Sequence, residues 1–81
     1  MSEIRVPEVL WGGSMAPAGV LERWRCPAGG CVEIGDVVAE VRIEDACHEL
    51  ASPGSGRLAA FARPGDIVEP GTIIGNVEDE F

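Results

Sequence analysis

The sequence predicts an all-β domain, folded as a small flattened barrel or sandwich. Short runs of alternating apolar and polar residues, the pattern of half-buried strands, recur between turns rich in glycine and proline. No segment carries apolar residues at helical spacing for long enough to form a convincing helix. In addition, a unit of about 36 residues occurs twice, whereas a solenoid needs about three copies to bury a continuous core. Two copies instead indicate a closed domain with a pseudo-twofold axis.

The repeat relates residues 19–42 to residues 56–78. Its first part matches Gly19, Leu21, Trp24 and Pro27 to Gly56, Leu58, Phe61 and Pro64. Its second part matches Gly29, Val32, Glu33, Gly35, Val37, Val38 and Val41 to Gly65, Val68, Glu69, Gly71, Ile73, Ile74 and Val77. With 81 residues, the chain suits one small domain, residues 1–81, and is too short for two.

Alternation also predicts which side chains form the core. We expect the inward-facing residues to be Val37, Ala39, Val41 and Ile43 on one strand and Ile73, Gly75 and Val77 on its counterpart. In each half, two large apolar residues lie three positions apart, namely Leu21 and Trp24, and Leu58 and Phe61. Because a regular strand puts such residues on opposite faces, each half is expected to contain either a bulge or an exposed aromatic side chain. The sequence leaves both alternatives open.

Two further segments lie outside the repeated strands. Before the first copy, the chain predicts a short strand over residues 4–7 and then a loop over residues 8–18, rich in glycine and small residues. Between the copies, residues 41–53 predict a hairpin with an acidic tip at Asp45. Aspartate suits such a turn because its side chain bonds nearby backbone and tolerates strained dihedral angles.

The composition narrows the classes of partner. Fourteen acidic side chains against six arginines give a formal charge of −8, which repels nucleic acid and disfavours an anionic membrane surface. No apolar run is long enough for a membrane span or the core of a signal peptide. Three cysteines without a secretory context argue for reduced thiols. We therefore expect a cytoplasmic protein, with a monomer as the favoured state.

The hairpin resembles the lysine-bearing hairpin of lipoyl domains. These belong to the biotinyl/lipoyl family, and the likeness is closest to those in the acyltransferase component of 2-oxo-acid dehydrogenase complexes. They carry Asp-Lys-Ala at the tip, followed by a strand ending near Ser-Pro. Matched back from Ser52-Pro53, Ala46 falls on the family's alanine, Glu44 on its aspartate and Asp45 on its lysine.

The resemblance covers nearly the whole chain. It includes Ser14-Met15, where the family typically has Thr-Met, and residues 52–56, where it has Ser-Pro-x-Ser-Gly. It implies two four-stranded sheets related by a quasi-twofold, with the attachment tip at one end and both termini at the other. One departure is an extra residue between Met15 and Gly19.

The departure that changes function is the missing lysine. Asp45 replaces it, and none of the 81 residues is lysine, so no side chain here can carry amide-linked lipoyl or biotin. We expect no cofactor. The resemblance then implies an interaction module, a decoy or regulator for a dehydrogenase, an acyltransferase core or a lipoate-attaching enzyme. The candidate recognition residues are Glu44, Asp45 and Ala46 at the tip and Trp11, Ser14 and Met15 in the loop that the family places beside it.

Other interpretations stay open at this point. Trp11 either presents an exposed anchor to a partner or folds back to close one end of the thin core. Instead of an interaction module, the chain could be a carrier that uses Cys47, two residues from Asp45, as another anchor. It could also be an accessory subunit of an acyltransferase or dehydrogenase complex.

A standalone enzyme is the least favoured function. A catalytic Asp45 would need a shifted pKa, and water at an exposed tip screens the neighbouring charges that shift it. Alternation turns His48 inward and Cys47 outward, which argues against a nucleophile–base pair. A lone inward histidine is most often a core residue that makes one hydrogen bond.

A zinc site is also disfavoured. Cys26, Cys31, Cys47 and His48 have the composition of a Cys₃His site. The resemblance, however, implies that the turn over residues 27–30 lies at the end away from the tip, so the four ligands cannot meet. A disulfide between Cys26 and Cys31 needs Cα atoms within about 7 Å, and we expect two free thiols instead.

Overall fold

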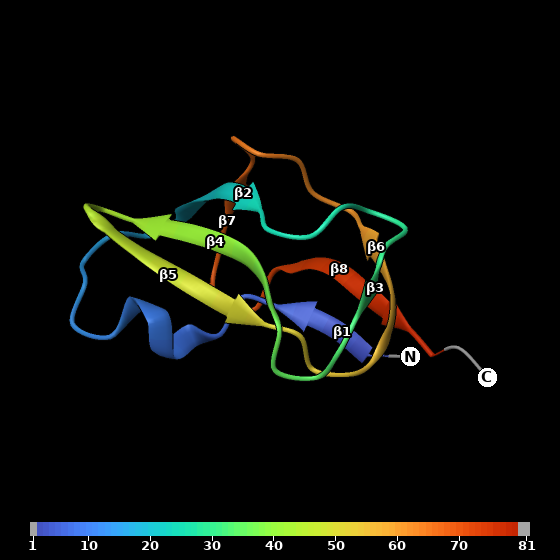
Figure 1. Ribbon diagram of the computed structural model, residues 1–81. Helices are drawn as coiled ribbons and strands as arrows, with labels where there is room; N and C mark the ends of the chain where they lie inside the picture. The colour runs from blue at the N-terminus through green and yellow to red at the C-terminus, as the bar shows by residue number, and fades with distance from the viewer. Residues whose placement is uncertain (1, 80–81) are drawn as a thin grey trace.

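Residues 2–79 are described by the computed structural model and form two four-stranded antiparallel sheets packed as a sandwich (Figure 1). One sheet has the strand order β1-β8-β6-β3 and the other β5-β4-β2-β7. The elements are β1 (Ser2–Arg5), the 3₁₀ helix η1 (Glu8–Trp11), β2 (Gly19–Trp24), β3 (Cys31–Val32), β4 (Val37–Ile43), β5 (Ala46–Ala51), β6 (Gly56–Ala60), β7 (Ile67–Val68) and β8 (Ile73–Glu78). The predicted fold class is confirmed.

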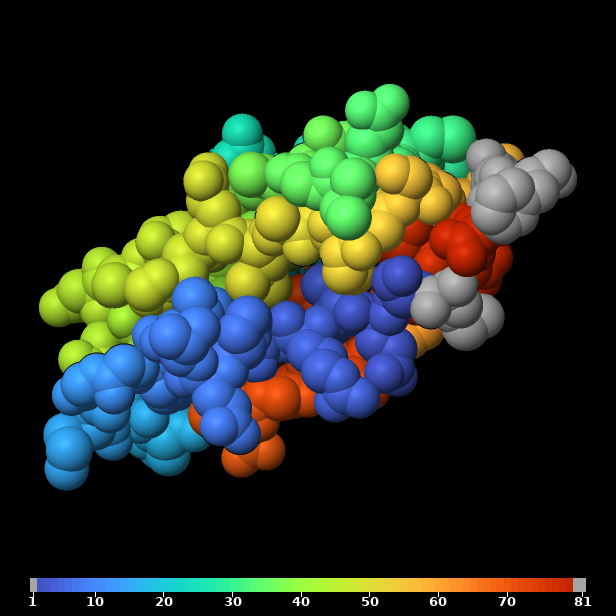
Figure 2. Space-filling model, turned by 90° about the horizontal axis from the view of Figure 1, so that it is seen from below, coloured from blue at the N-terminus to red at the C-terminus, as the bar shows by residue number. Residues whose placement is uncertain are grey.

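The molecule is elongated, with extents of 43 × 20 × 16 Å. The β4–β5 hairpin projects at one end, whereas β1 begins and β8 ends at the other (Figure 1). Figure 2 shows the loop that follows η1 beside this hairpin, where residues far apart in the sequence form one surface. In the described part of the chain, no helix is long and apolar enough to cross a membrane.

The core follows the predicted alternation over most of β4 and β8. Its buried members on these strands include Ala39, Val41, Ile43, Gly75 and Val77, as expected. The largest fully buried side chains include Leu21 and Leu58, which are equivalent in the two copies. Such a small domain hides a limited share of its surface, so each of these side chains is a large part of the core.

Two of the predicted core positions are wrong, for one shared reason. The β4–β5 register shifts between Val37 and Ala39, and the β1–β8 register steps from Gly75 to Ile73. Each shift inserts one extra residue, a β-bulge, which resets the alternation at the start of the strand. The bulges turn Val38 and Ile74 fully inward and leave Val37 and Ile73 half-buried.

The two halves place the aromatic residue that follows three positions after their buried leucine in different environments. In the first half, a bulge between Leu21 and Arg23 lets Trp24 pack against the core, and the Trp24 indole Nε1 donates to the Ala62 carbonyl at 2.9 Å. In the second half, β6 pairs regularly with β8 and ends before Phe61, which is 64% exposed. Both alternatives therefore occur, one in each copy.

The close approach of strands at Gly56 gives a prediction about stability. A Cβ on Gly56 would overlap the Glu78 carbonyl and lie 3.2 Å from the Cα of Asp79, both of them main-chain atoms. Gly56→Ala should therefore cost about 2–3 kcal/mol of unfolding free energy or prevent folding, because the backbone must move to make room. Urea denaturation followed by circular dichroism measures the loss.

Gly13→Ala is the matched control, since a Cβ there meets no atom within 4 Å. Its unfolding free energy should stay within about 0.5 kcal/mol of the parent. Equal denaturation midpoints for the two variants would contradict the strand approach described at Gly56.

Candidate functional site

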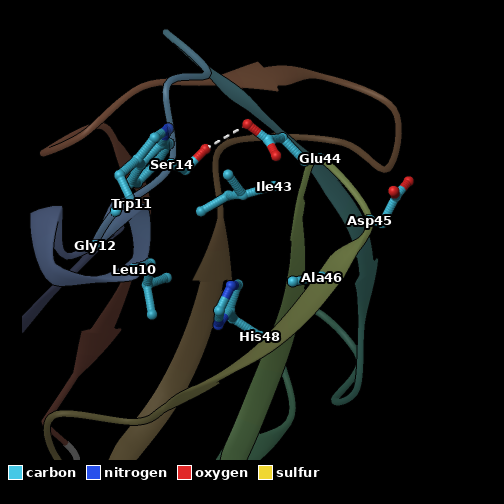
Figure 3. A pocket seen from close by; sticks show the side chains of 10 residues that line it. Leu10, Trp11, Gly12, Ser14, Ile43, Glu44, Asp45, Ala46 and His48 are labelled. Atoms are coloured by element: carbon cyan, nitrogen blue, oxygen red, sulfur yellow. Dashed lines mark hydrogen bonds between the residues drawn. The ribbon is translucent and has the colours of Figure 1, made fainter.

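The tip of the β4–β5 hairpin is a two-residue turn made of Glu44 and Asp45. Ile43 pairs directly with Ala46, so no other residue intervenes (Figure 3). Glu44 has a φ of 55°, a left-handed conformation that is uncommon outside glycine. The sequence predicted this strained position at Asp45. It falls on Glu44 because the favoured two-residue hairpin turns require a positive φ at their first position.

A hydrogen bond ties the preceding loop to this tip. The Ser14 hydroxyl donates to Oε1 of Glu44 at 2.7 Å and accepts from the Ala16 amide at 3.1 Å (Figure 3). The Ser14 amide in turn donates to the Trp11 carbonyl at 2.6 Å, which fixes the start of the loop on η1. Two of the candidate recognition residues, Ser14 and Glu44, are therefore in direct contact.

Trp11 closes one end of the core and is not an exposed anchor. Its side chain is only 7% exposed and belongs to the core cluster, because η1 folds the chain back over the end of the sandwich. Its indole Nε1 has no hydrogen-bond partner within residues 2–79. Met15, four residues later, is 94% exposed and is the large apolar side chain that the loop presents to solvent.

An open groove of about 560 Å³ runs between the loop and the hairpin (Figure 3). Its residues come from η1, the loop, and both strands of the hairpin: Leu10, Trp11, Gly12, Gly13, Ser14, Ile43, Glu44, Asp45, Ala46 and His48. His48 is half-buried and extends toward Leu10, in agreement with the predicted inward direction. The floor thus combines the apolar side chains of Leu10 and Ile43 with the imidazole of His48, and the rim carries two carboxylates.

A second hollow, of about 400 Å³, lies on the opposite side of the tip. It is lined by Ala18, Gly19, Val20, Arg42, Glu44, Asp45 and Ile67, and Ile67 is 74% exposed. The tip carboxylates therefore line both hollows, and the exposed Ile67 lines the second. Neither Leu10 nor Ile67 was a candidate from the sequence, because no motif marks residues that meet only through the fold.

The arginines on this sheet are occupied by other acids. Glu40 accepts from Arg25 at 2.7 Å and lies 3.3 Å from Arg23, and the Arg25 bond is the main reason that the pKa of Glu40 is lowered. Arg42 lies 3.8 Å from Glu22. Within residues 2–79, Asp45 has no ion-pair partner and Glu44 bonds to Ser14, so both tip charges lack a cation.

Cys47 faces outward, as predicted, beside this network. Its Sγ lies 3.8 Å from Oε1 of Glu40 and donates to it. Partial removal of water from the sulfur, followed by the negative charge of Glu40, raises the pKa of the Cys47 thiol. Because the thiolate is the nucleophile, a raised pKa makes Cys47 less reactive than an ordinary cysteine.

The remaining candidate ligands do not assemble. No disulfide joins Cys26 to Cys31, and Cys26 is half-buried with its sulfur 3.6 Å from the Val37 carbonyl. No group of three or more metal-ligating side chains comes together anywhere between Ser2 and Asp79.

Comparisons with known proteins agree with this fold. The family model described as "Biotin-requiring enzyme", the biotinyl/lipoyl family, matches residues 2–77. The solution structure of the lipoyl domain of the 2-oxoglutarate dehydrogenase complex from Azotobacter vinelandii is similar with a TM-score of 0.71. The match covers 94% of this chain and 96% of that one at 18% identity, and it supports the fold alone. Among curated proteins no match was found. Since the family model spans residues 2–77 of 81, the chain belongs to the biotinyl/lipoyl domain family.

Proposed function

We propose that this protein is a lipoyl-like domain that acts by docking to another protein and not by carrying a lipoyl group. The observation that carries the proposal is the tip itself. It has a two-residue turn between paired strands, tied to the loop by Ser14. The sequence match to the family motif aligns Asp45 of this turn with the attachment lysine. A carboxylate cannot form the amide that holds lipoate or biotin, so only the recognition role of the tip is retained.

The proposed partner is an enzyme that ordinarily meets a lipoyl domain. A dehydrogenase component, an acyltransferase core or a lipoate-attaching enzyme each has to contact the tip and its surroundings. Here those surroundings combine the exposed Met15, the exposed Ile67 and the two carboxylates. Apolar anchors beside a polar tip are the usual composition of a small protein interface. Binding without a lipoyl group makes the domain a competitor or a regulator of that enzyme.

Paired loop variants test the docking surface. Met15→Ala should leave the unfolding free energy within about 0.5 kcal/mol, because the side chain is solvated, and should weaken partner binding by about 1–2 kcal/mol. Trp11→Ala should instead cost about 3–5 kcal/mol of stability, because it empties part of the core. Calorimetric titration with purified dehydrogenase components and a lipoate-attaching enzyme, competed with an authentic lipoyl domain, measures binding. Absence of binding to all of them would reject the proposal.

Restoring the lysine tests whether the tip geometry is retained. Asp45→Lys should change stability by no more than about 0.5 kcal/mol, since the side chain is exposed at a turn. It should also become at least partly lipoylated in vitro by a lipoate-attaching enzyme, as shown by intact mass. Glu33→Lys, at an exposed turn before the other end of β4, is the control and should stay unmodified. A folded Asp45→Lys variant that accepts no lipoate would mean that enzymes of this class do not recognise the surface.

The alternative carrier function at Cys47 leads to a separate prediction. The raised thiol pKa should make alkylation of Cys47 by iodoacetamide slower at pH 8 than that of an unstructured cysteine peptide. Glu40→Gln should move the midpoint of its rate–pH profile downward, because a nearby negative charge that opposes the thiolate is lost. Peptide mapping by mass spectrometry measures the rate at each cysteine. Labelling of Cys47 as fast as the free peptide would revive the carrier alternative.

A further inference from the structure

We propose that the groove between the loop and the hairpin takes a basic residue, a lysine or arginine, supplied by the partner protein. This inference deepens the proposed function and rests on it for the identity of the docking surface. The position from which the family extends a lysine would here receive a cationic side chain from outside. The evidence lies in the charge of the rim, one unpartnered donor and the apolar part of the floor.

The charge of the rim is negative and not neutralised by the chain. Glu44 and Asp45 both line the groove, and neither forms an ion pair with any residue of the described range 2–79. The nearby arginines are engaged with other acids, Arg42 with Glu22 and the Arg23–Arg25 pair with Glu40. The chain contains no lysine that could reach the site. His48 is the side chain in this lining that can itself carry positive charge, and it forms no ion pair with either carboxylate within residues 2–79. A lysine or arginine in the groove would therefore come from another molecule.

The second observation is independent of charge. The indole Nε1 of Trp11, a residue that is only 7% exposed, has no partner in the described residues. Trp11 lines the groove, and its nitrogen is drawn on the side of the ring that faces Ser14 (Figure 3). A buried donor without an acceptor is costly. The nitrogen is covered in this structure, so a carbonyl oxygen brought by an occupant would satisfy it after a small shift of the groove wall.

The floor of the groove selects the shape of the occupant. Leu10 and Ile43 form an apolar surface below the carboxylates, and the half-buried imidazole of His48 lies beside it. A basic residue within a polypeptide has three matching parts: an aliphatic stem for this floor, a charged head for the rim, and a main-chain carbonyl for the indole. A bare metal ion offers neither the stem nor the acceptor, and residues 2–79 hold no cluster of metal-ligating side chains.

Nuclear magnetic resonance with a defined probe tests the assignment. The probe is the capped peptide acetyl-Ala-Lys-Ala-amide, titrated into ¹⁵N-labelled protein, with acetyl-Ala-norleucine-Ala-amide as its uncharged match. The lysine peptide should shift the Trp11 indole resonance saturably, together with the amides of Ser14 and Glu44. The indole of Trp24 is an internal control and should not move, because it already donates to Ala62.

Variants separate groove binding from general attraction to an acidic protein. The double variant Glu44→Gln with Asp45→Asn should bind the lysine peptide about fivefold more weakly or worse, as the loss of two exposed charge contacts implies. Glu33→Gln removes a charge at a distant exposed turn and should change the affinity less than about twofold. Trp11→Phe should keep the fold and weaken binding by removing the donor.

The inference is overturned if the norleucine peptide shifts the same resonances equally. It is also overturned if the lysine peptide perturbs acidic surface residues without the Trp11 indole, or if Glu33→Gln weakens binding as much as the double variant. The peptide test needs no partner enzyme, so the two proposals can fail separately. If the enzyme binds in a way that depends on Met15 but the lysine peptide shifts no groove resonance, this inference alone is rejected. If the lysine peptide binds in the groove but none of the tested enzymes binds the protein, the proposed function is rejected.

Discussion

Burial of Trp11 is the contact on which the functional end of the molecule depends. The chain between β1 and β2 would otherwise be a loop of glycine and small residues with no reason to adopt one position. By inserting Trp11 into the core, η1 brings Ser14 within hydrogen-bond distance of Glu44 and places Leu10 opposite the hairpin. The groove exists because these segments are held together, and core packing therefore creates the proposed recognition surface.

The distribution of charge complements this geometry. Arginine and glutamate side chains pair along the outer face of β2, β4 and β5. Glu40, for example, contacts both Arg23 and Arg25. Such exposed pairs add little stability each, but they engage the arginines of the sheet with acids other than those at the tip. The carboxylates at the tip consequently have no arginine partner within residues 2–79, in a protein whose formal charge is −8. A field of this kind directs the approach of a basic surface before any contact forms.

The sequence was informative about the fold because turn residues and apolar periodicity repeat twice. It failed where a single extra residue decides the outcome. Alternation predicts Val37 in the core instead of Val38, since it cannot show where a bulge shifts the inward-facing positions by one residue. The spacing of Leu21 and Trp24 did signal an irregularity, but only packing decides between a bulge and exposure. The groove was beyond prediction, because Leu10 and His48 are neighbours only after the loop meets the hairpin.

The left-handed turn at Glu44 has a consequence for the timing of association. The two-residue turn confines the backbone of Glu44, and the hydrogen bond from Ser14 confines its side chain. The neighbouring Asp45 is therefore attached to a backbone with little conformational freedom. A swinging arm works through mobility, whereas a fixed tip has lost that entropy before its partner arrives. Ordering an interface side chain on binding costs about 0.5–1.5 kcal/mol, and that cost is reduced here. The proposed docking would then proceed as an association of rigid bodies, in which productive collisions do not wait for a loop to order.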